Sequence, residues 1–159
     1  MTARLVDARL RAARPADADD VATVLIASRL AYQPFAPSAH PPDDVRAWVR
    51  QRLIPERDVT VADAGGTIVG VLATSQRDGA AWIEQLFVLP GWTGRGIGSR
   101  LLGHAHDGLP RPIRLWTFQA NAGARRFYER HGYRAIAFTD GRENEERCPD
   151  VLYELAAGA

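Results

Sequence analysis

The segment LPGWTGRGIGSRLLGHA, residues 89–105, combines five glycines with bulky apolar and basic residues and then becomes amphipathic. Glycine has no Cβ, so glycines just before a helix leave backbone N–H groups exposed and let a ligand approach them closely. The N–H groups at a helix start also carry a positive partial charge, which favours phosphate groups. The segment therefore predicts an anion site at the start of a helix.

Two common nucleotide-binding patterns fit this segment poorly. A P-loop requires Lys after its last glycine, but Ile97 follows Gly96. A dinucleotide fingerprint would place its third small residue at Ser99 or Leu101, and the segment follows an antiparallel meander with no acidic strand end about 20 residues on. These features disfavour a Rossmann-type redox enzyme. A glycine-rich turn without any ligand remains as an alternative.

Strand and helix patterns alternate along the chain. Period-two apolar patterns predict strands at 8–13, 58–63, 67–76, 81–89, 113–120, 133–140 and 151–157. Helical spacing and capping signals predict helices at 14–30, 41–54, 97–109 and 121–132. A helical crossover connects the strand at 81–89 to the strand at 113–120, so these two should pair in parallel. The prediction is an α/β fold with a mixed sheet.

Composition limits the functional classes. The chain has 159 residues, 46% of them apolar, which suits one domain over residues 1–159 with a core burying roughly 70% of the unfolded surface. Twenty basic side chains, all Arg, oppose 19 acidic ones, and this balance argues against a nucleic-acid partner.

Cysteine usage and hydropathy bear on location. Cys148 is the only cysteine, so an internal disulfide framework is excluded and a reducing cytoplasm is expected. No stretch approaches the roughly 18 apolar residues of a membrane span, and the first residues carry no apolar signal segment. We expect a cytoplasmic protein with no membrane association. No sequence feature decides between a monomer and a homodimer.

Two motifs resemble the GNAT superfamily of N-acetyltransferases. The segment LFVLPGWTGRGIGSRLL, residues 86–102, resembles that family's pyrophosphate-binding segment, with Thr93 where the family has Gln or Arg. The segment NAGARRFYERHGY, residues 121–133, resembles a second family element. The resemblance implies a single-domain GNAT fold: a mixed central sheet of about seven strands with helices on both faces, splayed between the fourth and fifth strands.

The resemblance also implies acetyl-CoA, or another acyl-CoA, as donor. Main-chain groups at Phe87 and Val88 would pair with the pantetheine arm, and Asn121 would meet the arm from the other side. An N–H near Val88 would stabilise charge on the thioester oxygen. Arg95 would add a mobile charge. The pyrophosphate would lie on the N–H groups of Gly94, Arg95, Gly96, Ile97, Gly98 and Ser99.

Attack by an amine needs a base, because an amine with a pKa near 10.4 is about 99.9% protonated at pH 7. Glu84 precedes Val88 by four residues, which predicts that it shares a strand face with Leu86 and Val88. It is the candidate base, with a partly exposed strand carboxylate as the alternative. Tyr128 stands at the family position that donates to the leaving thiolate, with a core tyrosine as the alternative.

Other residues carry weaker hypotheses. Tyr32 and Phe35, with His40, lie in a Pro-rich link and are candidate acceptor contacts. The acidic loop at 140–150 suits either a solvated hairpin or recognition of a cationic acceptor. His104 and His106 are two positions apart on a helix, so they cannot share a face, and no metal is expected.

The sequence thus predicts an N-acetyltransferase that transfers an acetyl group from acetyl-CoA to an amine by direct attack in a ternary complex. The acceptor, a small molecule or a peptide amine, is not identified by the sequence. The alternative is an acyl-CoA-binding regulatory module without turnover.

Overall fold

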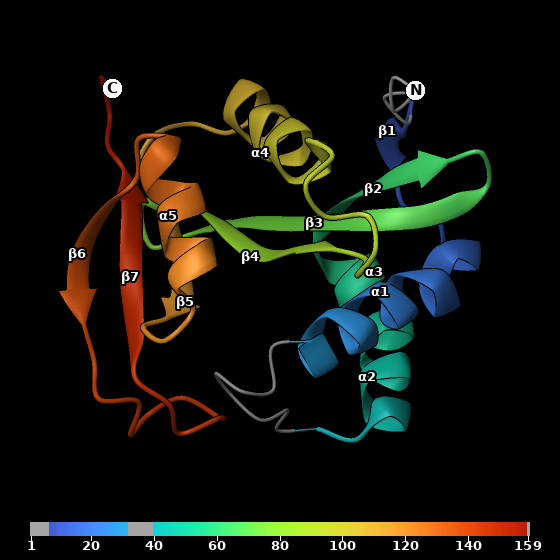
Figure 1. Ribbon diagram of the computed structural model, residues 1–159, viewed down its shortest axis with the longest axis horizontal. Coiled ribbons are helices and arrows are strands. Elements are labelled where there is room, and N and C mark those ends of the chain that lie inside the picture. Colours follow the sequence, from blue (N-terminus) through green and yellow to red (C-terminus); the bar gives the residue numbers. More distant parts are fainter. Residues whose placement is uncertain (1–6, 32–39, 159) are drawn as a thin grey trace.

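The computed structural model describes residues 7–31 and 40–158, which form a seven-stranded sheet with flanking helices (Figure 1). The strands are β1 (Arg9–Ala12), β2 (Asp58–Ala64), β3 (Thr67–Arg77), β4 (Ala80–Val88), β5 (Ile113–Phe118), β6 (Arg134–Phe138) and β7 (Asp150–Leu155). The helices are α1 (Ala18–Ala31), α2 (Pro42–Trp48), α3 (Ile54–Glu56), α4 (Ile97–Gly108) and α5 (Ala122–Arg130). A 3₁₀ turn, Pro15–Asp17, precedes α1.

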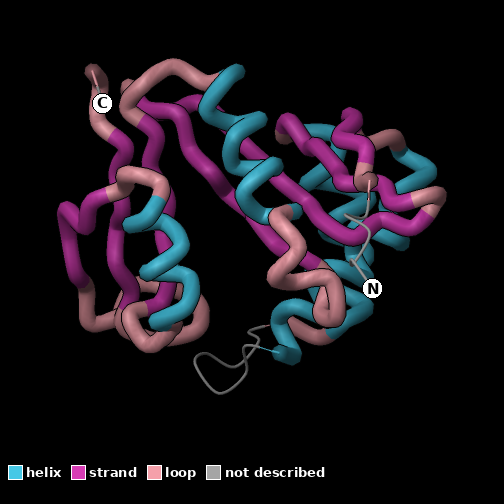
Figure 2. Tube along the Cα trace, turned by 45° about the horizontal axis from the view of Figure 1, so that its top comes forward, coloured by secondary structure: helices cyan, strands magenta, loops and turns pink. Residues whose placement is uncertain are grey.

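The sheet has the order β1-β2-β3-β4-β5-β7-β6. Strands β4 and β5 are parallel, as predicted from the helical crossover, and the other neighbours are antiparallel. Among the described residues, β4 and β5 pair only at Ala81 with Ile113 and Trp82 with Arg114. Beyond these pairs the two strands diverge (Figure 2), which confirms the predicted splay between the fourth and fifth strands.

Helices cover both faces of the sheet. On one face, α4 and α5 bury residues such as Leu101, Leu102 and Tyr128 against the sheet. On the other face, α1 buries Val21 and Leu25 against β2 and β3, together with a turn that follows α2. In Figure 1, α5 lies over β5 and β7. Helices α1 and α2 lie on the opposite side of β3 and β4 from α4.

The predicted helix at 41–54 is interrupted. Helix α2 passes into a π-helical turn, Val49–Leu53, in which Ile54 N–H donates to Val49 five residues back. Helix α3 then contains Pro55. Proline has no N–H to continue a regular ladder and its ring crowds the preceding turn, which accounts for the irregular end of this helix.

Close packing fixes the start of α4 on the sheet. A Cβ added to Gly70 of β3 would lie 2.9 Å from Leu101 Cδ1 and 3.0 Å from Ile97 Cγ2. Glycine at this position therefore lets α4 approach the sheet more closely than any larger residue would allow. The first turn of α4, which follows the glycine-rich segment, is positioned by this contact.

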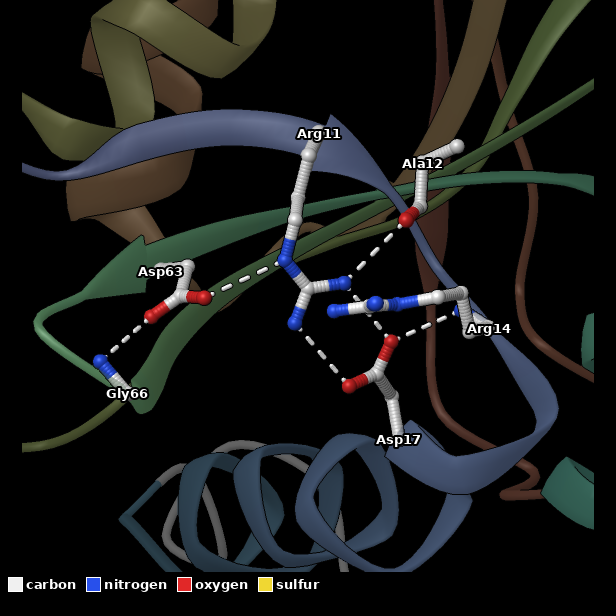
Figure 3. Close-up of polar contacts among 6 residues, drawn as sticks. All are labelled: Arg11, Ala12, Arg14, Asp17, Asp63 and Gly66. Carbon is white, nitrogen blue, oxygen red and sulfur yellow. Dashed lines mark hydrogen bonds and ion pairs between the residues drawn. The ribbon is translucent and has the colours of Figure 1, made fainter.

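An ion-pair network, the Arg11 clamp, ties β1 to the turn before α1 and to the β2–β3 hairpin (Figure 3). Arg11 Nη1 and Nη2 donate to the two oxygens of Asp17 over 2.8 and 3.0 Å, and Arg11 Nε donates to Asp63 Oδ2 over 3.1 Å. Asp17 Oδ2 also accepts from Arg14 N–H over 2.7 Å. Hydrogen bonding to Arg11 lowers the pKa of Asp17 to about 2.

Within the described part of the chain, no helix has the length and apolar character needed to cross a membrane.

Candidate active site

The glycine-rich segment leaves a helix start open to solvent. Gly91, Gly94 and Gly96 adopt positive φ values of 92°, 75° and 82°, conformations that L-residues with side chains rarely adopt. Gly96 is the N-cap of α4, so no side chain caps the first-turn amides of residues 97–99, which have no partner within the helix. A Cβ at Gly94 or Gly96 would meet no atom within 4 Å. The segment is therefore an accessible cluster of N–H groups at the positive end of a helix.

Helix α5 packs against this helix start. A Cβ at Gly98 would lie 3.5 Å from Phe127 Cζ and 3.7 Å from Val88 Cγ2. Ser99 Oγ lies 3.2 Å from His131 Nε2 at the end of α5. The two sequence motifs, which are separated along the chain, thus meet at one place in the fold.

The edge of β4 beside the diverging strand offers main-chain groups. Leu89 N–H donates to Val69 of β3 over 2.8 Å. Because main-chain groups alternate sides along a strand, Phe87 also faces β3, whereas Leu86 and Val88 face away from it, toward the gap left by β5. Ser28 Oγ donates to the Val88 carbonyl over 3.1 Å. Of the two residues predicted to pair with the pantetheine arm through the main chain, Val88 presents its N–H at the open edge of β4, whereas Phe87 does not. The main-chain groups of Leu86 also face this open edge.

A β-bulge changes the position of Glu84. Ile83 and Gln85 pair with adjacent residues of β3, so Glu84 between them is the extra residue. The expectation that Glu84 shares a face with Leu86 and Val88 is wrong, because the bulge interrupts the alternation. Ile83, Leu86 and Val88 pack on the face of α4 and α5, whereas Glu84 and Gln85 lie toward the face of α1.

Glu84 is held by two neighbours. Its Oε1 accepts from Ser75 Oγ over 2.6 Å and from Arg77 Nε over 3.3 Å. The Arg77 guanidinium in turn lies 4.0 Å from the ring centre of Trp82. Glu84 Oε2 makes no hydrogen bond to any residue that the structure describes. The carboxylate is thus oriented through one oxygen while the other is unengaged.

A cleft of about 1060 Å³ occupies the gap between β4 and β5. Its wall includes Glu84, Asn121 and Tyr128, three of the residues singled out from the sequence. Asn121 caps α5, its Oδ1 accepting from Ala124 N–H over 3.1 Å, and this leaves the Nδ2 group for a ligand.

Tyr128 is packed like a core tyrosine and also lines the cleft. Its side chain is 8% exposed and its ring contacts those of Phe127, Tyr133 and Tyr153, with centres 5.2, 5.7 and 6.3 Å apart. It also lines the cleft. The tyrosine is thus a packed residue whose orientation is fixed by aromatic neighbours and which still reaches the cavity.

The loop between β6 and β7 crosses the mouth of the cleft to α1. Arg29 Nη1 of α1 contacts Glu146 Oε1 over 3.0 Å, and His40 Nε2 contacts Glu145 Oε2 over 2.8 Å. Asn144 braces the loop by donating to the Cys148 carbonyl and accepting from Cys148 N–H, over 2.6 and 3.1 Å. The two glutamates of this acidic loop therefore bind groups from the opposite side of the cleft.

Comparison with known proteins identifies the fold and its family. Residues 25–133 match the Acetyltransferase (GNAT) family. The chain belongs to the GNAT family. A relative named "Uncharacterized N-acetyltransferase", from Archaeoglobus fulgidus, is 31% identical over 131 residues, which cover 75% of this chain and 88% of that protein.

Solved structures of other acetyltransferases share the fold over nearly the whole chain. The PaiA N-acetyltransferase of Thermoplasma acidophilum, solved in complex with coenzyme A, has a TM-score of 0.73 at 18% identity and covers 94% of this chain and 99% of its own. YncA of Salmonella typhimurium, solved with its cofactor acetyl-CoA, has a TM-score of 0.73 at 18% identity and covers 96% and 95%.

Some predicted residues of this GNAT chain are not located. Tyr32 and Phe35 lie outside the described residues. Within 7–31 and 40–158, no three His, Cys, Asp or Glu side chains are grouped as a metal would require. His106, considered as a ligand, instead has its Nε2 2.9 Å from the Tyr133 hydroxyl, and burial lowers the pKa of this histidine.

Sequence reasoning missed three contributions to the site. The main-chain groups of Leu86 face the open edge of β4. This could have been predicted, because Leu86 is two residues from Val88 and main-chain groups alternate sides along a strand. Gln85 lies toward the face of α1, and period-two alternation from Leu86 could have indicated this. The Arg29–Glu146 pair joins residues 117 positions apart, and no local pattern indicates it.

Proposed function

We propose that this chain is an N-acetyltransferase that uses acetyl-CoA as donor and an amine as acceptor, with residues 1–159 acting as one catalytic domain. The observation that carries the proposal is that the start of α4, the open edge of β4 and the cleft form one continuous path. The uncapped N–H groups at the start of α4 lie beside the end of β4, and the open edge of β4 leads into the cleft that contains Glu84 and Tyr128. A molecule with a phosphate end and a long thin arm suits this path.

Donor binding is assigned to residues of the described path. The pyrophosphate would be held by the N–H groups of residues 94–99, where the helix dipole adds to the hydrogen bonds. Arg95, whose guanidinium lies 4.8 Å from the Trp92 ring centre, would supply charge from the rim. The arm would take main-chain hydrogen bonds along β4 at Leu86 and Val88, with Phe87 supplying side-chain packing, and would meet the Asn121 amide on the other side of the cleft. The open space at Gly94 and Gly96 supports this fit.

The proposed chemistry is direct acyl transfer. Acetyl-CoA supplies the acetyl group as a thioester. The amine nitrogen bonds to the acetyl carbon as the carbon–sulfur bond breaks, and the amine proton passes to Glu84, directly or through water. Val88 N–H would stabilise negative charge developing on the carbonyl oxygen. The Tyr128 hydroxyl would hydrogen-bond to the departing sulfur.

Turnover with a range of amines tests the proposal. Free thiol released from acetyl-CoA is measured with amino acids, polyamines, aminoglycosides and peptide N-termini. We expect thiol release that depends on both the enzyme and an amine. Tight binding of acetyl-CoA with no acceptor-dependent release for any amine class would instead favour a regulatory acyl-CoA-binding module.

A further inference from the structure

A second cavity, the α1–α2 groove, lies between helices α1 and α2. It has a volume of about 830 Å³ and is lined largely by apolar side chains, among them Ile26 and Leu30 of α1 and Val45 and Trp48 of α2. Leu30 and Trp48 are 59% and 41% exposed. Large apolar side chains gathered in a groove are typical of a surface that binds an apolar group.

The groove is continuous with the catalytic cleft. Arg29, Gln85 and Glu145 line both cavities and form the neck between them. Gln85 follows Glu84 directly. Regular alternation from Leu86 directs Gln85 toward the face of α1, and the β-bulge places Glu84 on the same side. Since consecutive Cα atoms are about 3.8 Å apart, the neck begins within a few ångströms of the candidate base.

The charged side chains at the neck each contact a polar partner. Arg29 contacts Glu146 over 3.0 Å, and Glu145 contacts His40 over 2.8 Å. A ligand passing the neck therefore meets no buried charge that requires an opposite charge on the ligand. Beyond the neck the lining is apolar apart from His40 and the solvent-exposed Asp44, so a charged group placed against the apolar side chains would lose hydration without gaining a partner there.

We propose that the acceptor is a primary amine joined by only a few bonds to an apolar group, with the amine beside Glu84 and the apolar group in the α1–α2 groove. This inference rests on the proposed acetyltransferase function and specifies its substrate class. It disfavours polyamines and aminoglycosides, because their second charged group would have to enter the groove.

A series of alkylamines tests the groove. From ethylamine to hexylamine, kcat/KM should rise about two- to fourfold per methylene, as expected for partial to full burial of each group. Pentylamine and putrescine have similar length but differ in one end group, and pentylamine should be the better acceptor by about tenfold or more. Equal rates along the series, or preference for putrescine, would overturn the inference while leaving the acetyltransferase function intact.

Variants of the groove separate binding from general damage. Trp48→Ala and Leu30→Gln should each flatten the dependence on chain length and leave the KM for acetyl-CoA unchanged. Ile136→Ala is the matched control, because Ile136 is 48% exposed on β6 and lines neither cavity. Ile136→Ala should keep the dependence of kcat/KM on alkylamine chain length that the parent protein shows. A similar loss in all three variants would overturn the assignment of the groove.

Calorimetry of hexylamine with protein saturated by coenzyme A provides a readout without turnover. We expect measurable binding of hexylamine, with an affinity that Trp48→Ala lowers about tenfold. Ethylamine should show no comparable binding. Absence of coenzyme A binding would instead reject the proposed function itself, and undiminished hexylamine binding by Trp48→Ala would reject the groove alone.

Discussion

Replacement of Asp17 by Asn tests the Arg11 clamp, which anchors the N-terminal edge of the sheet. The pKa of Asp17 is lowered from 3.8 to about 2, first by hydrogen bonds from Arg11 and then by the Arg14 amide. At about 1.4 kcal/mol per pH unit, this difference corresponds to about 2 kcal/mol of folding stability at neutral pH. Asp17 is 8% exposed, so solvent screening removes little of this contribution.

The sign of the pH dependence follows from the lowered pKa. The carboxylate contributes its full stabilisation above pH 3.8 and loses it as the pH falls toward 2, with roughly half remaining near pH 3. Urea denaturation of the parent protein and Asp17→Asn should therefore differ by about 2 kcal/mol at neutral pH, and the gap should shrink on acidification.

A matched control separates this clamp from ordinary surface ion pairs. Asp43 contacts Arg46 over 3.1 Å, but its side chain is 96% exposed. Asp43→Asn should leave the free energy of unfolding unchanged within error, because exposed ion pairs stabilise little. A stability gap for Asp17→Asn that stays constant from neutral pH to about pH 3 would refute the electrostatic reasoning and indicate lost packing.

Four further changes address the site. Gly96→Val should abolish acetyl-CoA binding in calorimetry while the fold persists, because a β-branched residue at a φ of 82° would distort the segment before α4 and place a side chain in its open space; undiminished binding would contradict the phosphate cradle. Glu84→Gln should lower kcat/KM most near neutral pH and recover as rising pH deprotonates the amine; a pH-independent defect would indicate a structural role. Tyr128→Phe should lower kcat roughly 10- to 1,000-fold with less than about a threefold change in acetyl-CoA affinity; parent-rate turnover limited by chemistry would reduce this tyrosine to a core residue. Gly70→Ala should cost about 1–3 kcal/mol, because the added Cβ would lie 2.9 Å from a side-chain carbon of α4; an unchanged Tm would show that α4 can shift freely.

Much of the fold follows from local patterns in the sequence. Period-two apolar patterns predicted the strands of the meander, and the helical crossover predicted the parallel pairing of β4 with β5. The Asn121 cap was also predictable, because a side chain that caps a helix acts on amides two or three positions away.

The remaining features depend on nonlocal contacts. The bulge at Glu84 is a one-residue irregularity in the pairing with β3, and the apolar pattern of β4 carries no signal for it. Side-chain direction at Glu84 was therefore predicted wrongly. The contact of Arg29 with Glu146 depends on how a loop after β6 lies against α1, which only the assembled sheet determines.

Transfer of an isotopically labelled acetyl group tests the central claim most directly. The protein is incubated with labelled acetyl-CoA and its best amine acceptor, and label in the amine is compared with free thiol. Direct transfer in a ternary complex predicts label in the amine equal to the thiol released, with none retained on the protein. Thiol release without label in the amine, or label that accumulates on the protein before reaching the amine, would contradict the account.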